Sequence, residues 1–211
     1  MTSNHWGCPL KTLSELWDIA WNKELRERSK DTDIPQSSWK ASGRATKKYP
    51  NKEDDKWWAE NGPKQLDNWV QFRGNGWQIY DINGTPGIEI NVLAMMDGVP
   101  VKMMIDRLMV TPEGELVILD LKSGRTTPDW MQLAFYAAGM DLTLGIRPKW
   151  GTYWMARTGT TSAMIDLDKY PTEVIVDFVK RFDNARKQGI FLPNLSHCSR
   201  CGFNDKCKWK E

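Results

Sequence analysis

The spacing of apolar residues changes along the chain, from a helical period at the start to short strand-like runs from Trp77 onward. Apolar residues recur at helical spacing behind Pro9, a residue favoured in the first turn of a helix, which predicts a helix over residues 9–29. The polar, mixed-charge stretch Lys30–Lys64 predicts only short helical or loop pieces. Four strands are predicted after it, at Trp77–Ile82, Gly87–Met96, Val99–Val110 and Glu115–Leu121.

The rest of the chain alternates helices and strands. Helical spacing returns over Asp129–Leu142 and Thr172–Lys187, and strands are predicted between them at Lys149–Ala156 and Thr160–Leu167. We therefore expect an α/β fold, with a mixed central sheet that contains an antiparallel meander and is flanked by helices. A length of 211 residues suits one domain. Its expected parts are a mostly helical segment (1–75), a core (77–190) and a C-terminal cysteine loop (191–211).

Composition excludes several classes of protein. Hydrophobic residues make up 40% of the chain, which suits a globular protein and not a disordered one. The net charge of +2 is too small to indicate nucleic-acid binding by itself. No apolar run approaches the roughly 18 residues of a membrane helix, and residues 1–10 lack the pattern of a signal peptide. We therefore expect a cytoplasmic protein with no membrane partner.

Two predicted hairpins bring acidic residues from separate strands together. Asp97-Gly98 between apolar runs is the strongest short-range hairpin signal, and a two-residue turn there places Glu89 opposite Asp106. The turn Thr111–Glu115 has Pro and Gly where a three-residue hairpin needs them. Its register places Asp106 opposite Asp120 as well, so three carboxylates fall in one row.

A row of carboxylates needs compensation, because like charges directly opposed in a sheet destabilise it by roughly 0.2–1 kcal/mol per exposed pair. A divalent cation would supply it, and oxygen ligands favour Mg²⁺ or Mn²⁺. Since side chains alternate faces, Lys122 shares a face with Asp120, and the carbonyl of Leu121 lies near the same edge. Lys122 would then stabilise a developing phosphorane or help to activate water. The alternative is that these acids are ordinary solvent-side residues.

The cysteines are distributed unevenly. Cys8 stands alone, whereas Cys198, Cys201 and Cys207 crowd the last fourteen residues. In a reducing cytosol this spacing indicates a metal site rather than disulfides. Four thiolates hold either Zn²⁺ or an iron-sulfur cluster, and spacing alone does not choose between them. A zinc site in which one of the two histidines replaces Cys8 is the rival arrangement.

Three segments carry a resemblance to a known family. Ile105–Arg107 looks like its motif II, Ile118–Gly124 is similar to its Asp-x-Lys-x-Gly motif, and Gln132–Tyr136 matches its Gln-x-x-x-Tyr motif. Over most of its length the chain resembles the RecB-like branch of the PD-(D/E)XK nuclease superfamily. The specific resemblance is to the iron-sulfur exonucleases, which include CRISPR-associated and AddB-type members. It implies a restriction-endonuclease-like core.

The resemblance also implies metal-binding and catalytic roles. Catalytic metal would be bound by Asp106, Asp120 and the Leu121 carbonyl. Glu89 would occupy the upstream acidic position of the family, and Lys122 would be catalytic.

Further roles follow from the same resemblance. Gln132 and Tyr136 are four residues apart, so they share a helix face, and in the family such residues position DNA near the metals. The four cysteines would hold a [4Fe-4S] cluster that joins the two ends of the chain. One departure is Thr46, which stands where the family usually has a metal-binding His.

The leading hypothesis is a Mg²⁺- or Mn²⁺-dependent DNA exonuclease that acts on single-stranded ends, in the cytoplasm of a bacterium or a phage-infected host. It would work in DNA repair or recombination, and a homo-oligomer and a helicase or recombination partner are both left open. One alternative is a DNA-binding or assembly protein with an impaired nuclease site, which the missing His favours. The other is a zinc-stapled nucleic-acid-binding module.

Overall fold

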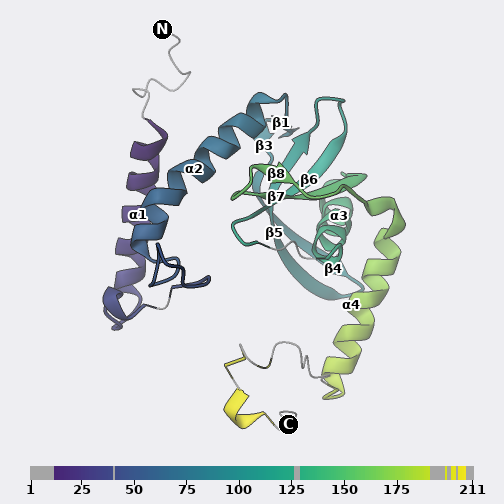
Figure 1. The fold of residues 1–211 in the computed structure, drawn as a ribbon. Helices are drawn as coiled ribbons and strands as arrows, with labels where there is room; N and C mark the ends of the chain where they lie inside the picture. The colour runs from purple at the N-terminus through teal and green to yellow at the C-terminus, as the bar shows by residue number, and fades with distance from the viewer. Residues whose placement is uncertain are drawn as a thin grey trace.

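The structure, a computed structural model, describes residues 12–39, 41–125, 129–190, 198, 201–202 and 204–207. Two N-terminal helices lie side by side next to a mixed sheet, and α3 lies between that sheet and α4 (Figure 1). The helices are α1 (Leu13–Lys30), α2 (Asp55–Gly74), α3 (Met131–Leu144) and α4 (Thr172–Lys187). Within the described ranges no helix carries an apolar stretch long enough to cross a membrane.

The described strands form one mixed sheet and a small separate ribbon. The sheet contains β1 (Gln78–Ile79), β4 (Ile88–Met96), β5 (Val99–Val110), β6 (Leu116–Lys122), β7 (Trp150–Met155), β8 (Thr160–Thr161) and β9 (Ile165–Asp166), and the ribbon pairs β2 (Asp81–Ile82) with β3 (Thr85–Pro86). Strand β5 pairs antiparallel with β1, β4 and β6, whereas β6 and β7 are parallel. Helix α3 supplies the crossover that a parallel pair requires. The predicted antiparallel meander in a mixed α/β fold is confirmed.

Both predicted hairpin registers are confirmed. Asp97 and Gly98 have φ angles of 49° and 81°, the left-handed values of a type I′ turn, and β4 and β5 pair in the expected register from that turn onward. Strands β5 and β6 also pair as expected, as far as Arg107 with Leu119. The next position in that register places Asp106 beside Asp120.

Element boundaries differ from prediction in a few places. Helix α1 begins at Leu13 after Thr12, whose side chain forms a reciprocal capping box with Glu15, and residues 9–11 lie outside the described part of the chain. The strand predicted at Trp77–Ile82 is divided between β1 and β2. The strand predicted at Thr160–Leu167 is divided between β8 and β9 and ends in a 3₁₀ turn, η2 (Leu167–Lys169). Two more 3₁₀ turns are η1 (Gln36–Ser38) and η4 (Asn204–Lys206).

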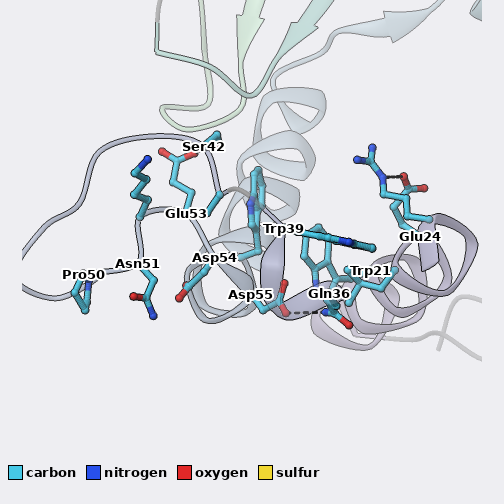
Figure 2. A pocket seen from close by; sticks show the side chains of 15 residues that line it. Trp21, Glu24, Gln36, Trp39, Ser42, Pro50, Asn51, Glu53, Asp54 and Asp55 are labelled. Carbon is cyan, nitrogen blue, oxygen red and sulfur yellow. Dashed lines mark hydrogen bonds and ion pairs between the residues drawn. The ribbon is translucent and has the colours of Figure 1, made fainter. Parts of the chain in front are cut away.

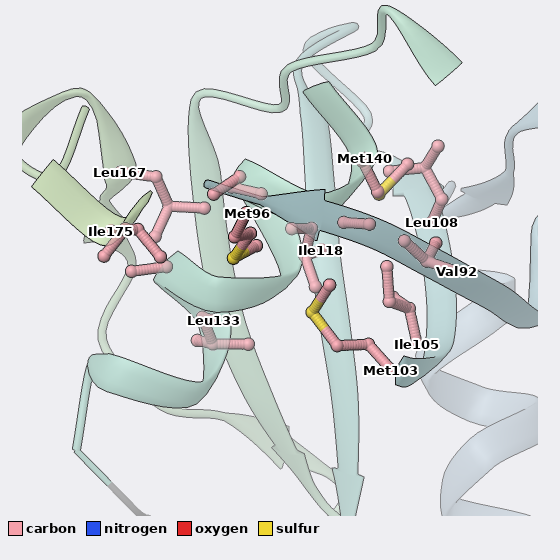
Figure 3. Packing of buried hydrophobic residues seen from close by; sticks show 14 of the residues in the cluster. Val92, Met96, Met103, Ile105, Leu108, Ile118, Leu133, Met140, Leu167 and Ile175 are labelled. Carbon is pink, nitrogen blue, oxygen red and sulfur yellow. The ribbon is translucent and has the colours of Figure 1, made fainter. Parts of the chain in front are cut away.

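The sheet is covered on both faces. The larger cluster of buried side chains lies between the sheet, α3 and α4, and Figure 3 labels ten of its members: Val92, Met96, Met103, Ile105, Leu108, Ile118, Leu133, Met140, Leu167 and Ile175. A second cluster contains Phe72, Met109, Leu119 and Trp154 and packs α2 against the strands. Leu119 and its neighbour Ile118 therefore face different clusters, as the alternation of a strand requires.

Helix α2 corrects the prediction of short pieces over Lys30–Lys64. It is 20 residues long and begins after Asp54, whose side chain accepts a hydrogen bond from the Trp57 amide at 3.0 Å. Pro63 stands inside the helix, and a proline there removes a backbone hydrogen bond and usually signals a break. Packing of the tryptophan-rich helix against α1 and the sheet overrides this local signal.

Three stacked tryptophans join α1 to α2. The rings of Trp17, Trp21 and Trp58 lie with centroids 5.5–5.9 Å apart and interplanar angles of 14–27°. Trp17 also covers Gly62, where an added Cβ would lie 2.1 Å from the indole ring. Because an indole cannot yield as a flexible side chain would, this position requires glycine.

We predict that Gly62→Ala destabilises the protein by about 1–3 kcal/mol, the usual cost of overpacking. Urea unfolding, followed by tryptophan fluorescence, would measure the loss. Gly74→Ala is the matched control, because Gly74 is in the same helix and has no heavy atom within 4 Å of an added Cβ. We expect that variant to be neutral or slightly stabilised. Equal effects of the two substitutions would contradict the packing account.

Candidate active site

Asp106 and Asp120 are brought together on neighbouring strands β5 and β6. Asp106 is half-buried, and its Oδ2 accepts a hydrogen bond from the backbone amide of Leu121 at 2.8 Å, so its carboxylate reaches across to β6. Asp120 is buried, with only 2% of its surface exposed. The sequence analysis predicts this neighbourhood from the second hairpin register.

Each oxygen of the Asp120 carboxylate has a polar side chain beside it. Its Oδ1 accepts a hydrogen bond from Gln132 Nε2 at 2.9 Å. Its Oδ2 is buried and forms an ion pair with Lys122 Nζ at 2.6 Å. Burial raises the pKa of Asp120 and the nearby charge of Asp106 raises it further, while the contact with Lys122 opposes both effects. A divalent cation bound by both carboxylates would offset the charge of Asp106 as well.

Gln132 on α3 contacts this carboxylate, and Tyr136, one turn later on the same helix, contacts Gln132. The Gln132 amide nitrogen also lies 2.7 Å from the Tyr136 hydroxyl, and its oxygen accepts a hydrogen bond from Lys122 Nζ at 3.2 Å. Gln132 therefore contacts Asp120, Lys122 and Tyr136 together. Burial raises the pKa of Tyr136, and the charges of Asp120 and Asp106 add to the rise. The structure thus places side chains from all three predicted motifs at one point.

Tyr153 on β7 is a site residue that sequence reasoning missed. It is the Cα partner of Asp120 in the parallel pair β6–β7, and Lys122 Nζ lies 5.5 Å from its ring centroid. Its hydroxyl donates to the carbonyl of Asp129 at 2.6 Å, and burial raises its pKa. The aromatic ring gives the ammonium of Lys122 a favourable face. Only the strand pattern of β7 was visible in the sequence, because local signals do not give a parallel register.

Glu89 lies level with the acidic pair but turns away from it. Its neighbours Ile88 and Ile90 both pair with β5, while Glu89 itself has a φ of 49°, which is rare for a residue other than glycine. Its side chain is exposed and lies 3.1 Å from Arg107 Nη1. The structure therefore brings Asp106, Asp120 and Lys122 together and leaves the Glu89 carboxylate with an arginine.

The acidic pair fits a hard divalent cation. Among the described residues, no three His, Cys, Asp or Glu side chains come close enough together to hold a metal ion. Mg²⁺, however, often binds through one or two carboxylates and completes its shell with water and substrate phosphate. Asp106 and Asp120 supply that number, although the buried Oδ2 of Asp120 is already paired with Lys122 at 2.6 Å.

The three C-terminal cysteines are free thiols in the described part of the chain. The Cys201 amide donates to the Cys198 carbonyl at 3.2 Å, and Cys207 directly follows η4. The fourth predicted ligand, Cys8, lies outside the described residues, as do both histidines. The predicted junction of the chain ends therefore stays a prediction. Thr46, at the position of the missing His, accepts a hydrogen bond from the Tyr49 amide at 3.0 Å.

A separate pocket of about 830 Å³ lies between α1, the start of α2 and the segment that joins them (Figure 2). Trp21, Trp39 and Trp58 contribute its aromatic walls. Its carboxylates already have partners: Glu24 pairs with Arg28 at 2.6 Å, and Asp55 accepts from Gln36 at 2.8 Å. The acidic pair of β5 and β6 does not line this pocket.

Comparison with known proteins gives consistent results. The family model described as the PD-(D/E)XK nuclease superfamily matches residues 10–208. The chain is 29% identical to the Gene 69 protein of Mycobacterium phage D29, over 78% of this chain and 69% of that protein. It is 31% identical to the Gene 69 protein of Mycobacterium phage L5, over 58% of this chain and 44% of that protein.

We predict that Mn²⁺ raises the melting temperature of the wild-type protein and leaves Asp120→Asn almost unchanged. A ligand at 100 times its Kd stabilises a protein by about 2.7 kcal/mol. Because Asp120→Asn removes the ion pair with Lys122 but also removes a buried charge beside Asp106, we expect the metal-free variant to melt close to wild type. Thermal unfolding with and without Mn²⁺ measures both effects.

Asp183→Asn is the control for this experiment. Asp183 is also buried, at 7% exposure, but it lies on α4 and pairs with Lys187 at 2.7 Å. The substitution should lower the melting temperature because it removes that ion pair, while the Mn²⁺ shift should persist. A full Mn²⁺ shift in Asp120→Asn would show that Asp120 holds no metal.

Proposed function

Because the chain belongs to the PD-(D/E)XK nuclease superfamily, we propose that it is a Mg²⁺- or Mn²⁺-dependent deoxyribonuclease that degrades single-stranded DNA from its ends. The observation that carries the proposal is the contact of Gln132 with both Asp120 and Lys122, which joins two of the motifs, while the Leu121 amide joins Asp106 to them. Packing of the core does not require charged residues at these positions, because neutral side chains would fill the same space. A buried carboxylate beside a second one and a lysine is instead typical of a functional site.

In the proposed hydrolysis, two carboxylates would bind the metal ion and one lysine would act on the phosphate. Asp106 and Asp120 would hold the cation, with the Leu121 carbonyl as a further oxygen donor. Such an ion, when bound, supplies positive charge to a phosphate and makes a water more acidic. The Lys122 ammonium would stabilise the negative charge that develops on the phosphate. Asp120, Gln132 and the Tyr153 ring already hold this ammonium in place.

The preference for single strands rests on the RecB-like motifs and on one exposed aromatic side chain. Trp130 stands at the start of α3, two residues before Gln132, and exposes 36% of its surface. Tyr170 stacks on one face of its ring at 3.9 Å with an interplanar angle of 3°. An unpaired base on the other face would gain roughly 1–3 kcal/mol from stacking, a contribution that a paired duplex offers less readily.

We predict that Lys122→Ala lowers kcat by about 10²–10³, the usual effect of removing one charge-stabilising donor. End-labelled single strands with Mn²⁺, resolved by length over time, would measure the rate and show whether products shorten from an end. Lys180→Ala is the control, since Lys180 lies on α4 in an exposed pair with Asp97. Undiminished cleavage by Lys122→Ala would refute the assignment.

We further propose that Cys8, Cys198, Cys201 and Cys207 hold a [4Fe-4S] cluster. Support comes from the one-plus-three spacing, which uses every cysteine of the chain, and from the hydrogen bond of the Cys201 amide to the Cys198 carbonyl. A cluster there would stabilise the fold by closing a very long loop. We assign it no step in catalysis.

Anaerobically purified protein should be brown and contain about four irons per chain, as the cluster formula requires. Cys201→Ser should lose the visible absorbance and most of the iron, because one of four thiolates is gone. Metal analysis and visible spectra of the two proteins test this. A colourless wild-type protein with one zinc per chain would favour the zinc alternative.

A further inference from the structure

Arg157 links two distant parts of the chain beside the candidate site. It lies in the turn after β7, where its Nε donates to the carbonyl of Ser123 at 2.6 Å. Its Nη2 lies 2.9 Å from Oε2 of Glu53, a residue 104 positions earlier in the chain. Ser123 directly follows Lys122, so one guanidinium connects the N-terminal part to the backbone next to the candidate catalytic lysine.

Glu53 is a firm anchor for this guanidinium. It is 7% exposed, and its Oε2 also accepts from the Ser42 hydroxyl at 3.0 Å; Figure 2 shows both side chains at one end of the pocket. An added Cβ at Gly43 would lie 2.3 Å from its other oxygen, so the chain approaches the carboxylate closely. A buried carboxylate requires a cation, and Arg157 is the one that pairs with it.

The ring of Trp57 holds Arg157 from a further direction. The guanidinium carbon lies 4.6 Å from the ring centroid, within the range of a cation–π contact. The Arg157 side chain is only 18% exposed. Glu53 and Trp57, both in the N-terminal part, therefore hold the guanidinium that donates to the Ser123 carbonyl.

The backbone after Asp120 is held by successive residues of β7 and its turn. The Ala156 amide donates to the Lys122 carbonyl at 2.9 Å, and Arg157 takes the next carbonyl, that of Ser123. Asn68 of α2 donates to the Ala156 carbonyl at 2.9 Å. Without Arg157, the Ser123 carbonyl would lose its hydrogen bond to an anchored partner, and the backbone after Lys122 would keep only the Ala156 amide as an attachment.

We propose that Arg157 is a positioning residue: by tying Ser123 to buried Glu53, it sets where Lys122 stands relative to Asp120. The catalytic consequence rests on the proposed function, whereas the positional claim does not. Lys122 Nζ must remain within reach of both Asp120, at 2.6 Å, and Gln132, at 3.2 Å. A displacement of about 1 Å at a reacting group is enough to cost on the order of 10²-fold in rate.

Arg147 is a matched control, because it lies just before the start of β7, whereas Arg157 lies just after its end. It too is a partly buried arginine, with 24% of its side chain exposed. It donates to the Thr172 hydroxyl at 2.6 Å and to the carbonyls of Tyr170 and Leu167 at 2.9 and 3.2 Å. Like Arg157, it therefore joins separate segments through several hydrogen bonds, but it does not contact the segment that carries Lys122.

The test compares Arg157→Lys with Arg147→Lys in the full-length protein, well below the melting temperature of each. Lysine keeps the charge, but it lacks the planar guanidinium whose separate N–H groups contact Glu53 and Ser123 at once. Hydrogen exchange resolved at residues 121–125 reports on the backbone, and kcat and KM for Mn²⁺-dependent cleavage report on catalysis. Both variants should melt earlier. Only Arg157→Lys should exchange faster at 121–125 and lose about tenfold or more in kcat, with KM changed less than about twofold.

Glu53→Gln is the second variant, because it keeps the size of the anchor and removes its charge. It should show the same pattern to a smaller extent. Unchanged exchange at 121–125 in both Arg157→Lys and Glu53→Gln, or an equal loss of kcat in Arg147→Lys, would overturn the positioning role. If the wild-type protein cleaves no DNA, the proposed function fails, and the exchange comparison still decides whether Arg157 positions this segment.

Discussion

Two carboxylates on neighbouring strands repel each other, and the repulsion grows when one of them is buried away from water. In this protein Asp106 and Asp120 meet in this way. The surrounding groups only partly offset the cost: the Leu121 amide binds one carboxylate, and Gln132 and Lys122 contact the other. A cation bound between the two carboxylates would reduce this repulsion and so stabilise the folded protein. The proposed metal dependence depends on that repulsion, and Lys122 is placed where it offsets part of it.

The fold meets this constraint with elements from the whole chain. The β5–β6 hairpin sets the two acids side by side, and the α3 crossover returns Gln132 and Tyr136 to the same point. Helix α2 and the segment before it then support the end of β6 from outside the sheet, through Asn68 and through the Glu53–Arg157 pair. The N-terminal part is thus more than a cover for the sheet, since it contacts the strand ends next to the site.

Sequence reasoning succeeded where the determining signal was local. The hairpin registers follow from a few turn residues, so the neighbourhood of Asp106 and Asp120 was predictable, and the shared helix face of Gln132 and Tyr136 follows from their spacing. It failed where long-range packing decides. Tyr153 reaches the site through a parallel register, and the polar, mixed-charge composition of Lys30–Lys64 did not indicate the 20-residue helix α2. The turned side chain of Glu89 comes from a left-handed backbone within a strand, which no pattern of residue types announced.

The most direct test is the position of manganese in a crystal of the full-length protein, located by its anomalous scattering. The account predicts an ion bound by both the Asp106 and Asp120 carboxylates, next to the Leu121 carbonyl and near Lys122. Manganese elsewhere on the protein, with those two carboxylates apart and no ion between them, would contradict it.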